Sequence, residues 1–554
     1  MDLLYKKYAR EELDSSGRLC RLTFEAPDSY NFAYDCVDDI AARSPEKSAL
    51  VWLSGDQSEE KTFTFADMRD ESMRAASFFA SLGIKKGDAV MLILKRHYTF
   101  WHAVIGLHRI GAVAVPATNQ LLEHDLAYRF NKAKIAAVVC TSDGFVKEEC
   151  EKAFASSPTV RTKILVGEER AGWESWHSGL SSQPADFPRP TGEKATRRDE
   201  AMLMYFTSGT TGYPRLAVHA HTYSLGHIFT GRYWHNADPD GLHFTISDTG
   251  WGKAVWGKLY GQWLSETAVF AYDFERFDAD TILRLFSRFR ITTFCAPPTM
   301  YRFFIKEDLS KYDLSSLKYA CTAGEALNPE VFNRFKEYTG LSIMEGFGQT
   351  ETTLTVANMV GDIPRPGSMG RPNPQYRLRL VDSDRQDVET GETGEIVIDL
   401  SEGRPYGLFL GYVGDDEANA AAVADGLYHT GDTAWSDEDG YLYYVGRTDD
   451  LIKSSGYRIS PFEVESVIME LPYVLECAVI GLADDLRGQL VTAVIVPVKG
   501  TDATDELKKE VQNYVKASTA PYKYPRRVEF VSELPKTISG KIKKAELRKA
   551  YNAQ

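Results

Sequence analysis

Short apolar runs rich in β-branched residues alternate with helical patterns along most of this chain, and this alternation limits the folds that are open to it. Residues 89–94 have the composition of a strand, residues 100–109 that of a helix, and residues 112–116 and 135–140 those of two further strands. A strand–helix–strand rhythm favours α/β layers with a largely parallel sheet. The same scheme fits four later runs, at residues 201–206, 267–272, 291–296 and 318–322.

The residue composition and the pattern of strand-like runs change towards the C-terminus. A turn rich in Gly and Glu at 389–395 leads into a smaller section with strand-like runs, and a charged turn follows Gly446. A chain of 554 residues also exceeds the size at which one core keeps growing. We therefore expect an α/β fold with two domains: a large N-terminal domain of layered βα subdomains plus a β-rich subdomain (1–448), and a small mobile α+β C-terminal domain (449–554).

Charge and cysteine usage exclude several classes of function. The formal net charge of -14 argues against a nucleic-acid-binding protein, which needs an extended basic surface. Basic residues do gather between Lys516 and Lys549, either as a solvated face or as a site for small anions. The seven cysteines are scattered and lack a CxxC pair, so neither a disulfide framework nor a zinc site is indicated.

The first ten residues are charged and lack the apolar core of a secretory signal. No uninterrupted apolar stretch is long enough to cross a bilayer. We therefore expect a cytoplasmic protein without a transmembrane segment. The sequence leaves open whether the chain forms a homo-oligomer.

The strongest local signal is the run Thr-Ser-Gly-Thr-Thr-Gly-Tyr-Pro-Arg at 207–215, directly after a strand-like segment. Hydroxyls and glycines this dense form a loop whose backbone N–H groups can approach phosphate oxygens closely. Taken alone, the run is more often a flexible turn. It is not a Walker loop, because the Gly-Lys-Ser/Thr ending is missing.

Six further motifs follow in a fixed order. They are Ala-Gly-Glu (323–325), Glu-Gly-Phe-Gly-Gln-Thr-Glu (345–351), Tyr-His-Thr-Gly-Asp (428–432), Gly-Arg-Thr-Asp-Asp (446–450), Ser-Gly-Tyr-Arg (455–458) and Pro-Lys-Thr-Ile-Ser-Gly-Lys (535–541). Together with 207–215 they resemble the signature of the acyl-adenylate-forming (AMP-binding) superfamily over roughly residues 32–550. The match is closest to the medium-chain acyl-CoA synthetases, which implies an AMP-forming acid–thiol ligase.

The resemblance implies a set of nucleotide contacts. Glu351 would bind Mg²⁺ through a hard carboxylate oxygen, and Thr350 would donate to a phosphate. Lys541 would stabilise the charge that builds as a carboxylate attacks the α-phosphate. ATP or AMP would further be contacted by Thr207, Ser208, Gly209, Thr210, Thr211, Gly212, Tyr213, Pro214, Arg215, Gly324, Glu325, Glu345, Gly346, Phe347, Gly348, Gln349, Asp432, Arg447 and Arg458.

The resemblance also implies coenzyme A as the acceptor and a moving C-terminal lobe. Asp449 falls at the family's hinge position, where a few backbone rotations can reorient a lobe. Basic side chains in the matching positions suit the phosphates of CoA. The CoA contacts read as Gln120, Ser455, Gly456, Tyr457, Arg487, Lys516, Tyr524, Pro525 and Arg526.

The acyl pocket is expected around residues 247–256. Bulky Trp251, Lys253 and Trp256 indicate a shortened pocket for a short- to medium-chain acid, including branched acids such as 2-methylbutyrate or isobutyrate. Core packing is an equal alternative for these tryptophans. Two departures from the family pattern stand out: Arg215 replaces the usual lysine, and Phe347 replaces Tyr or Trp.

Rival functions share part of this signature. A luciferase-like oxygenase, an adenylating enzyme that loads another acceptor, and a non-catalytic nucleotide-binding protein all remain to be distinguished. A peptide-synthetase module would carry further domains, whereas this sequence runs only a few residues past Lys541. A pure binder is disfavoured, since both Glu351 and Lys541 are present.

Overall fold

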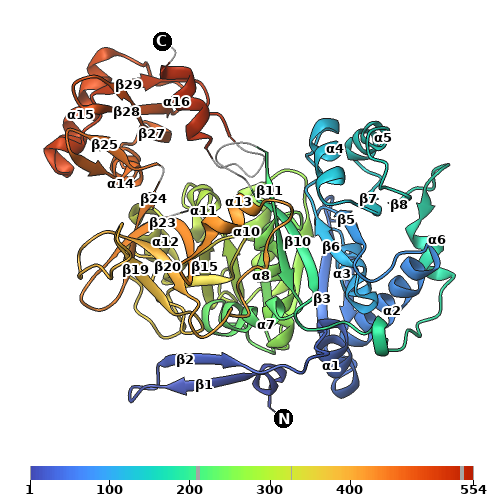
Figure 1. Cartoon of the computed structure of the whole chain (residues 1–554). Helices are drawn as coiled ribbons and strands as arrows, with labels where there is room; N and C mark the ends of the chain where they lie inside the picture. Colours follow the sequence, from blue (N-terminus) through green and yellow to red (C-terminus); the bar gives the residue numbers. More distant parts are fainter. Residues whose placement is uncertain (1, 208–212, 326, 449, 537–541, 553–554) are drawn as a thin grey trace. The chain divides into compact units, whose positions relative to one another are not determined.

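The computed structural model describes residues 2–207, 213–325, 327–448, 450–536 and 542–552. The chain, whose helices and strands are labelled in Figure 1, divides into two compact units. Unit 1 contains residues 1–207, 215–377 and 400–421, and unit 2 contains residues 208–214, 378–399 and 422–554.

The first sheet of unit 1 has eight strands in the order β21-β11-β10-β6-β5-β7-β8-β9. Its strands from β10 to β9 run parallel, while β11 and β21 are antiparallel additions. The central strands are buried throughout, as expected for a parallel sheet covered on both faces. The bounds are β5 Ala89–Ile93, β6 Val113–Pro116, β7 Ala137–Thr141, β8 Thr162–Val166, β9 Glu174–Ser175, β10 Ala201–Thr207, β11 Arg215–Ala220 and β21 Gly411–Tyr412.

The second sheet of unit 1 has nine strands in the order β18-β17-β16-β15-β14-β12-β13-β3-β4. The six strands from β16 to β3 are parallel, and antiparallel strands close both edges. The bounds are β3 Ser48–Ser54, β4 Glu60–Thr64, β12 Leu242–Thr245, β13 Ala268–Asp273, β14 Thr293–Ala296, β15 Tyr319–Ala323, β16 Ile343–Gly348, β17 Leu354–Ala357 and β18 Arg371–Pro372.

Helices pack on these sheets, and their ends follow local sequence signals. Helix α2 begins at a capping box in which Thr64 and Asp67 satisfy each other's backbone N–H groups. Helix α3 ends at Gly111, whose φ of 72° suits a residue without a side chain. The helices of unit 1 are α1 Asp39–Arg43, α2 Phe65–Ser81, α3 Thr99–Ile110, α4 Glu123–Lys132, α5 Val146–Phe154, α6 Trp176–Ser181, α7 Tyr223–Ile228, α8 Gly252–Lys258, α9 Tyr260–Leu264, α10 Ala279–Phe289, α11 Pro298–Phe304 and α12 Pro329–Thr339; α13 (Asp416–Ala422) ends at the boundary with unit 2.

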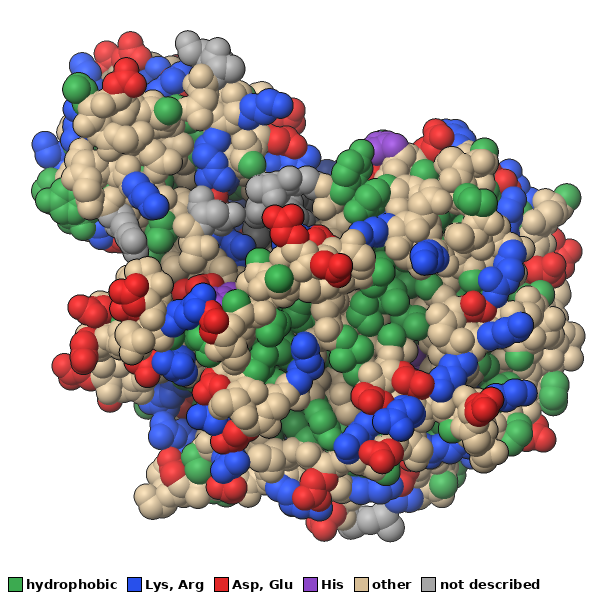
Figure 2. Space-filling model, viewed as in Figure 1, with side chains coloured by type: hydrophobic (Ala, Val, Ile, Leu, Met, Phe, Trp, Pro, Cys, Tyr) green, Lys and Arg blue, Asp and Glu red, His purple; other side chains and the backbone are tan. Residues whose placement is uncertain are grey.

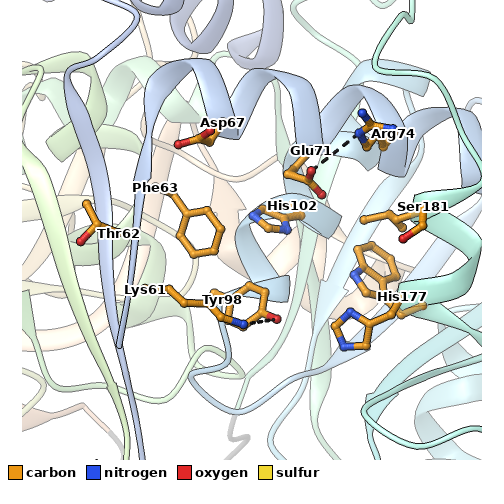
Figure 3. Close-up of a pocket in the computed structure, with 12 residues that line it drawn as sticks. Lys61, Thr62, Phe63, Asp67, Glu71, Arg74, Tyr98, His102, His177 and Ser181 are labelled. Atoms are coloured by element: carbon orange, nitrogen blue, oxygen red, sulfur yellow. Dashed lines mark hydrogen bonds and ion pairs between the residues drawn. The ribbon is translucent and has the colours of Figure 1, made fainter. Parts of the chain in front are cut away.

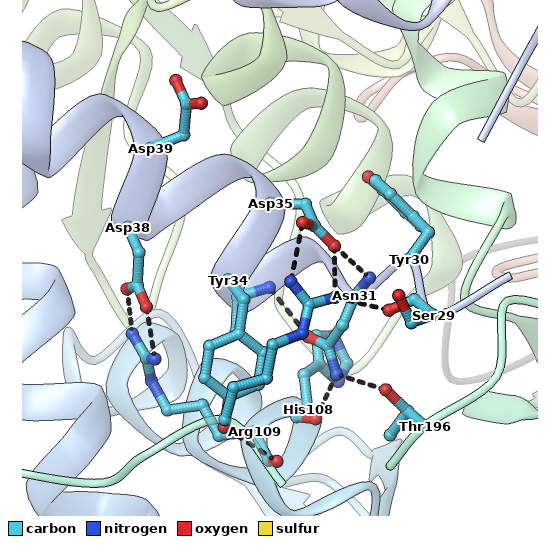
Figure 4. A network of polar contacts seen from close by, with 12 residues as sticks. Ser29, Tyr30, Asn31, Tyr34, Asp35, Asp38, Asp39, His108, Arg109 and Thr196 are labelled. Carbon is cyan, nitrogen blue, oxygen red and sulfur yellow. Dashed lines mark hydrogen bonds and ion pairs between the residues drawn. The ribbon is translucent and has the colours of Figure 1, made fainter. Parts of the chain in front are cut away.

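Helix α3 is the centre of the unit 1 core, because all of its 12 residues are buried. Its close contact with α2 requires Gly106: a Cβ atom there would lie 2.7 Å from the Cβ of Ala75. At its C-terminal end the buried guanidinium of Arg109 pairs with Asp38, 2.6 Å away (Figure 4). It also donates to the Ser72 hydroxyl. The same network joins α3 to the N-terminal segment and to Thr196, since the Asn31 amide donates to the carbonyl of His108 and to the Thr196 hydroxyl.

Unit 2 contains two smaller sheets. One has five strands, in which β19-β20-β23-β22 form a path and β24 pairs with β23. The other is built around the long hairpin β27–β28, with β25, β26 and β29 beside it and three helices. The bounds are β19 Leu378–Val381, β20 Gly394–Asp399, β22 Val423–Ala424, β23 Leu427–Ser436, β24 Leu442–Arg447, β25 Ile452–Ser454, β26 Tyr457–Ile459, β27 Val474–Asp484, β28 Gly488–Pro497, β29 Arg527–Phe530, α14 Pro461–Ile468, α15 Asp505–Ser518 and α16 Lys544–Asn552.

The expected fold class is confirmed: the chain is mixed α/β, with parallel sheets, a β-rich section and a small C-terminal α+β part. The boundary between residues 448 and 449 and the mobility of the C-terminal domain stay predictions. No helix in the described part of the chain has both the length and the apolar character needed to cross a membrane.

The surface of unit 1 mixes charges of both signs. On the face shown in Figure 2, Lys and Arg side chains lie among Asp and Glu side chains. Many of them form exposed ion pairs, such as the pair of Arg284 with Asp280 on α10. Pairs of this kind contribute little to stability, because water and salt screen them.

The buried ion pair of Arg109 with Asp38 should contribute more to stability than an exposed ion pair does. Replacing Arg109 by Met removes the guanidinium and leaves Asp38 without its ion-pair partner in a largely buried place, which should destabilise unit 1 by about 3 kcal/mol. Urea unfolding followed by tryptophan fluorescence measures the loss. Arg284→Met, which breaks an exposed pair, is the matched control and should change stability by less than about 0.5 kcal/mol. Equal losses in the two variants would contradict this interpretation.

Candidate active site

The expected phosphate loop joins two strands of the first sheet. Thr207 and Arg215 lie opposite each other at the ends of β10 and β11, which pair antiparallel. Thr207 is buried, whereas Tyr213 is largely exposed. The two described ends of the expected loop therefore lie at the same end of the β10–β11 pair.

Glu351, the expected magnesium ligand, is held in place by Tyr412. The Tyr412 hydroxyl donates to Oε1 of Glu351 over 2.7 Å, and the backbone carbonyl of Glu351 accepts from Phe409 over 2.7 Å. Burial and the neighbouring carboxylate raise the pKa of Tyr412, so its hydroxyl keeps its proton. The arrangement fixes the direction of a carboxylate that a hard cation could bind.

Arg215 lies beside the same tyrosine. Its guanidinium is 5.5 Å from the centre of the Tyr412 ring, and its Nε lies 3.5 Å from Oδ2 of Asp415. A planar guanidinium can stack on an aromatic face and bind an acid at the same time, which a lysine ammonium does less well. Arg215 is thus linked through Tyr412 to Glu351.

The expected acyl segment lies next to the expected catalytic motif at 345–351. A Cβ atom on Gly252, the first residue of α8, would lie 3.8 Å from Cγ2 of Thr350 and 4.0 Å from the ring of Tyr205. A Cβ atom on Gly348 would lie 2.7 Å from the Trp256 ring and 2.5 Å from the carbonyl oxygen of Thr353. Glycine is therefore required at 348 for the two segments to meet, whereas at 252 there is room for a small side chain beside Thr350.

The loop before α8 is fastened to the first sheet. The backbone N–H of Thr249 donates to the carbonyl of Lys95 over 3.2 Å, and its hydroxyl donates to the same oxygen. A Cβ atom on Gly250 would lie 2.2 Å from the backbone nitrogen of Thr118, so only glycine permits this approach. Asp248 lies 3.8 Å from the guanidinium of Arg96.

The three bulky side chains of the acyl segment differ in environment. Trp256 is buried, and its indole N–H donates to the Tyr223 hydroxyl over 3.3 Å. The ammonium of Lys253 donates to the carbonyl of Ala323, and burial lowers its pKa. Trp251 is half-buried at the start of α8. Lys253 therefore ties α8 to the end of β15, next to the expected adenine segment.

The expected adenine segments occupy the ends of β15 and β16. Gly324 follows β15 with a φ of 104°, and Glu325 accepts from the Thr299 hydroxyl over 3.1 Å. Phe347 is half-buried in β16. Glu345 is buried in the same strand, accepts from the backbone N–H of Leu327 over 3.2 Å, and has a pKa that burial raises to about 8.

In unit 2 the expected ribose contact Asp432 is buried in β23, where Arg447 of β24 lies opposite it. Oδ1 of Asp432 accepts from the Tyr444 hydroxyl over 3.0 Å, and Oδ2 lies 3.5 Å from Nη1 of Arg447. A Cβ atom on Gly431 would lie 2.8 Å from the Arg447 guanidinium. Two of the predicted nucleotide residues are thus brought together.

The expected CoA residues of unit 2 form two groups. Ser455, with a φ of 52°, donates its backbone N–H to the carbonyl of Arg487 over 2.8 Å. Lys516 and Arg526 lie over the ring of Tyr524, at 5.6 and 4.8 Å from its centre. Gln120 belongs to unit 1, where it is exposed beyond β6.

The AMP-binding enzyme family model matches residues 37–413, which is more than half of the chain, and the model of the AMP-binding enzyme C-terminal domain matches residues 463–541. The chain belongs to the AMP-binding enzyme family. It is 38% identical to mouse acyl-coenzyme A synthetase ACSM3, over 99% of this chain and 96% of the relative. It is 40% identical to human acyl-coenzyme A synthetase ACSM4, over 94% and 90%.

Solved structures of the family agree with this fold. An anthranilate CoA ligase in complex with anthranoyl-AMP superposes with a TM-score of 0.86 at 29% identity, covering 95% of this chain and 98% of that one. A benzoate CoA ligase from Burkholderia xenovorans superposes with a TM-score of 0.80 at 25% identity, covering 94% and 100%. The expected enzyme class, an AMP-forming acid–thiol ligase of the acyl-CoA synthetases, is confirmed at the level of the family.

The expected cytoplasmic location is wrong. The acyl-CoA synthetase relatives are named as mitochondrial proteins. The expectation rested on the lack of a secretory signal, and that observation excludes secretion without distinguishing the cytoplasm from an organelle.

Several residues of the family signature lie outside the described residues. They are Ser208, Gly209, Thr210, Thr211, Gly212, Asp449 and Lys541, together with the side chain of Arg458. Their assigned roles stay predictions.

Sequence reasoning missed three residues of this AMP-binding enzyme that contact predicted ones. Tyr412 contacts both Glu351 and Arg215, and Asp415 contacts Arg215. Tyr444 contacts Asp432. Tyr412 lies 61 residues from Glu351 in sequence, and no local pattern links them. A weak signal was available for Tyr444, which lies in the apolar strand just before the motif at 446–450.

A groove of about 640 Å³ lies elsewhere on unit 1, between β4, α2, α3 and α6 (Figure 3). Its charged side chains already have partners: Lys61 contacts Glu59 and the Tyr98 hydroxyl, and Arg74 donates to the carbonyl of Gln183. None of the described residues that line this groove is a predicted site residue. The lining consists of Lys61, Thr62, Phe63, Asp67, Glu71, Arg74, Tyr98, His102, Trp176, His177, Leu180 and Ser181.

Glu345 should make stability depend on pH. Its pKa of about 8 in the folded protein lies above the unfolded value of 4.5, so the folded state holds the proton more tightly. This contribution to stability is complete below pH 4.5 and is lost as the pH rises through 8. Glu345→Gln keeps the acceptor oxygen without the charge and should therefore raise Tm at pH 8.5 relative to wild type, with a smaller difference at pH 5.

Thermal unfolding at a series of pH values measures this effect. Glu330→Gln, at an exposed position on α12, is the control and should leave the profile unchanged. A Tm difference between Glu345→Gln and wild type that is the same at every pH would contradict the buried, protonated state of Glu345.

Proposed function

We propose that this enzyme activates a short- to medium-chain carboxylic acid, including branched acids such as 2-methylbutyrate or isobutyrate, in two steps. The acid and ATP form acyl-AMP and pyrophosphate, and acyl-AMP and CoA then form acyl-CoA and AMP. The observation that carries the proposal is the closeness of Gly252 to Thr350 within unit 1: a Cβ atom on Gly252 would lie 3.8 Å from Cγ2 of Thr350, one residue from the Tyr412-bound Glu351. This closeness supports an acid site beside the proposed phosphate-binding motif.

Magnesium fits the residues around Glu351. Mg²⁺ is usually bound by one or two carboxylates together with substrate phosphates. Among the described residues, no group of three or more His, Cys, Asp or Glu side chains could hold a metal ion by itself. We therefore assign the ion to Glu351 and the nucleotide phosphates, where it would neutralise phosphate charge, while Tyr412 orients the carboxylate.

The first step requires stabilisation of negative charge. A carboxylate and a triphosphate are both anionic, and charge spreads over the transition state as the acid attacks the α-phosphate. A fixed ammonium or hydroxyl donor at that point lowers the barrier, by roughly 2.7–4 kcal/mol in comparable systems. We assign the ammonium to Lys541, the hydroxyl to Thr350, and the ribose contact in unit 2 to Asp432.

The packing of Trp256 supports a small acid. Its ring is buried and meets Gly348 so closely that a Cβ atom there would lie 2.7 Å away. A large ring in this position limits the depth that an acyl chain can reach. The anthranilate and benzoate CoA ligases that share this fold are named for small acids, which supports a short pocket.

Coenzyme A is the proposed acceptor. The acyl-CoA synthetase names of the relatives support this choice, as do the cations Lys516 and Arg526 around Tyr524. Guanidinium and ammonium groups suit the phosphates of CoA. An enzyme that loads another acceptor would share the first step and differ only in the second.

A panel of carboxylic acids tests the proposal. We expect CoA-dependent AMP release with isobutyrate, 2-methylbutyrate, butyrate and hexanoate, and at least tenfold lower kcat/KM with palmitate, because one methylene in an apolar pocket changes the rate by at least several-fold. Gly252→Val, which adds bulk beside Thr350, should lower kcat/KM most for the largest acids accepted. A preference for palmitate would refute the short pocket. Release of no pyrophosphate with any acid would refute the adenylation step.

Tyr412→Phe tests the orientation of Glu351. The variant keeps the ring beneath Arg215 and loses only the hydroxyl that binds the carboxylate. Loss of such a supporting contact typically lowers metal affinity or activity by 10- to 100-fold. We expect about tenfold slower pyrophosphate release at low Mg²⁺, with partial recovery at high Mg²⁺. Tyr338→Phe, at an exposed site on α12, is the control; identical Mg²⁺ dependence in all three proteins would exclude this role.

A further inference from the structure

Two exposed tyrosines of unit 2 are stacked on each other. The rings of Tyr457 and Tyr522 have centroids 4.0 Å apart and an angle of 12° between their planes. Tyr457 is 50% exposed and Tyr522 is 36% exposed. Large aromatic side chains that remain this accessible form a flat apolar surface, which suits contact with a ligand.

The stack connects two segments that are far apart in sequence. Tyr457 begins β26 after the turn formed by Ser455 and Gly456, both with positive φ. Tyr522 lies in the short 3-10 helix η6, Pro521–Lys523. The ammonium of Lys523 binds both carboxylate oxygens of Glu463, at 2.6 and 2.8 Å, and so fastens η6 to α14. Tyr522 therefore has a fixed support from which to hold the Tyr457 ring.

Cations lie close to the η6 end of this connection. Nζ of Lys523 lies 5.8 Å from the centre of the Tyr522 ring. Lys516 and Arg526 lie over the ring of Tyr524, two residues further along the chain, and Nη1 of Arg526 donates to the Tyr524 hydroxyl over 2.9 Å. An aromatic platform with cations on neighbouring residues matches a ligand that combines a purine ring with phosphates.

We propose that Tyr522 is a positioning residue for coenzyme A: by stacking on Tyr457 it holds that ring as a platform for the adenine end of CoA. The inference rests on the proposed function, because it takes CoA as the acyl acceptor. Neither the family signature nor the comparisons point to Tyr522. Base–aromatic stacking depends on the π face rather than on a hydroxyl, so the phenol oxygen of Tyr522 is dispensable.

The test measures the thioester-forming step with two thiols. Pantetheine carries the reactive thiol of CoA and lacks the nucleotide. With Tyr522→Ala, KM for CoA should rise about tenfold, since stacking of one base is typically worth a five- to 100-fold change in affinity. KM for pantetheine should stay at the wild-type value. Tyr522→Phe should keep the wild-type KM for CoA. If Tyr522→Ala folds poorly, Tyr522→Leu takes its place and should raise KM for CoA by the same factor.

The control and the outcomes separate this inference from the function on which it rests. Tyr338→Ala, at an exposed tyrosine of unit 1, should change neither KM. Equal changes with CoA and pantetheine, or a Tyr522→Phe variant as impaired as Tyr522→Ala, would overturn the positioning role. If the wild-type enzyme forms acyl-AMP and transfers it to neither thiol, the proposed function fails and this inference fails with it.

Discussion

The candidate site of unit 1 depends on how the loops at the carboxyl ends of two parallel sheets are fastened together. The Thr249 backbone binds the carbonyl of Lys95, which follows β5 of the first sheet, and Gly250 approaches the backbone of Thr118 beyond β6. The backbone N–H of Arg96 donates to Asp273 at the end of β13 over 3.1 Å. In open α/β sheets, ligands bind beyond the carboxyl ends of the strands. Joining two such edges gives the proposed acid-binding segment a rigid support on both sides.

The sequence was sufficient for those features that depend on local pattern. The buried strands β5, β7 and β10 are short apolar runs, and the structure places them within a few residues of the expected positions. The family signature led to Glu351 and Asp432. It could not lead to Tyr412, because a hydrogen bond between residues 61 positions apart depends on how β21 pairs with β11. Tyr522 was missed for the same reason: its role follows from a stacking contact that only the fold brings about.

The two departures from the family pattern have different explanations. Arginine at position 215 fits its surroundings, because a flat guanidinium can lie near the Tyr412 ring and pair with Asp415. The hydroxyl of Tyr412 in turn donates to Glu351, so the identity of residue 215 is connected with the position of this proposed magnesium-binding carboxylate. The structure offers no comparable explanation for phenylalanine at position 347.

The contact between Gly348 and Trp256 has a consequence for how the acid preference of such an enzyme could evolve. A side chain at 348 would collide with both the indole ring and the backbone carbonyl of Thr353, so a smaller residue at 256 would not by itself make room for one. Under the proposed function, a smaller residue at 256 would deepen the acyl pocket and leave a void beside Gly348, at a cost in packing. Because the Thr353 carbonyl bars a side chain at 348 from filling that void, a shift towards longer acids at this position carries a loss of stability that other residues must offset.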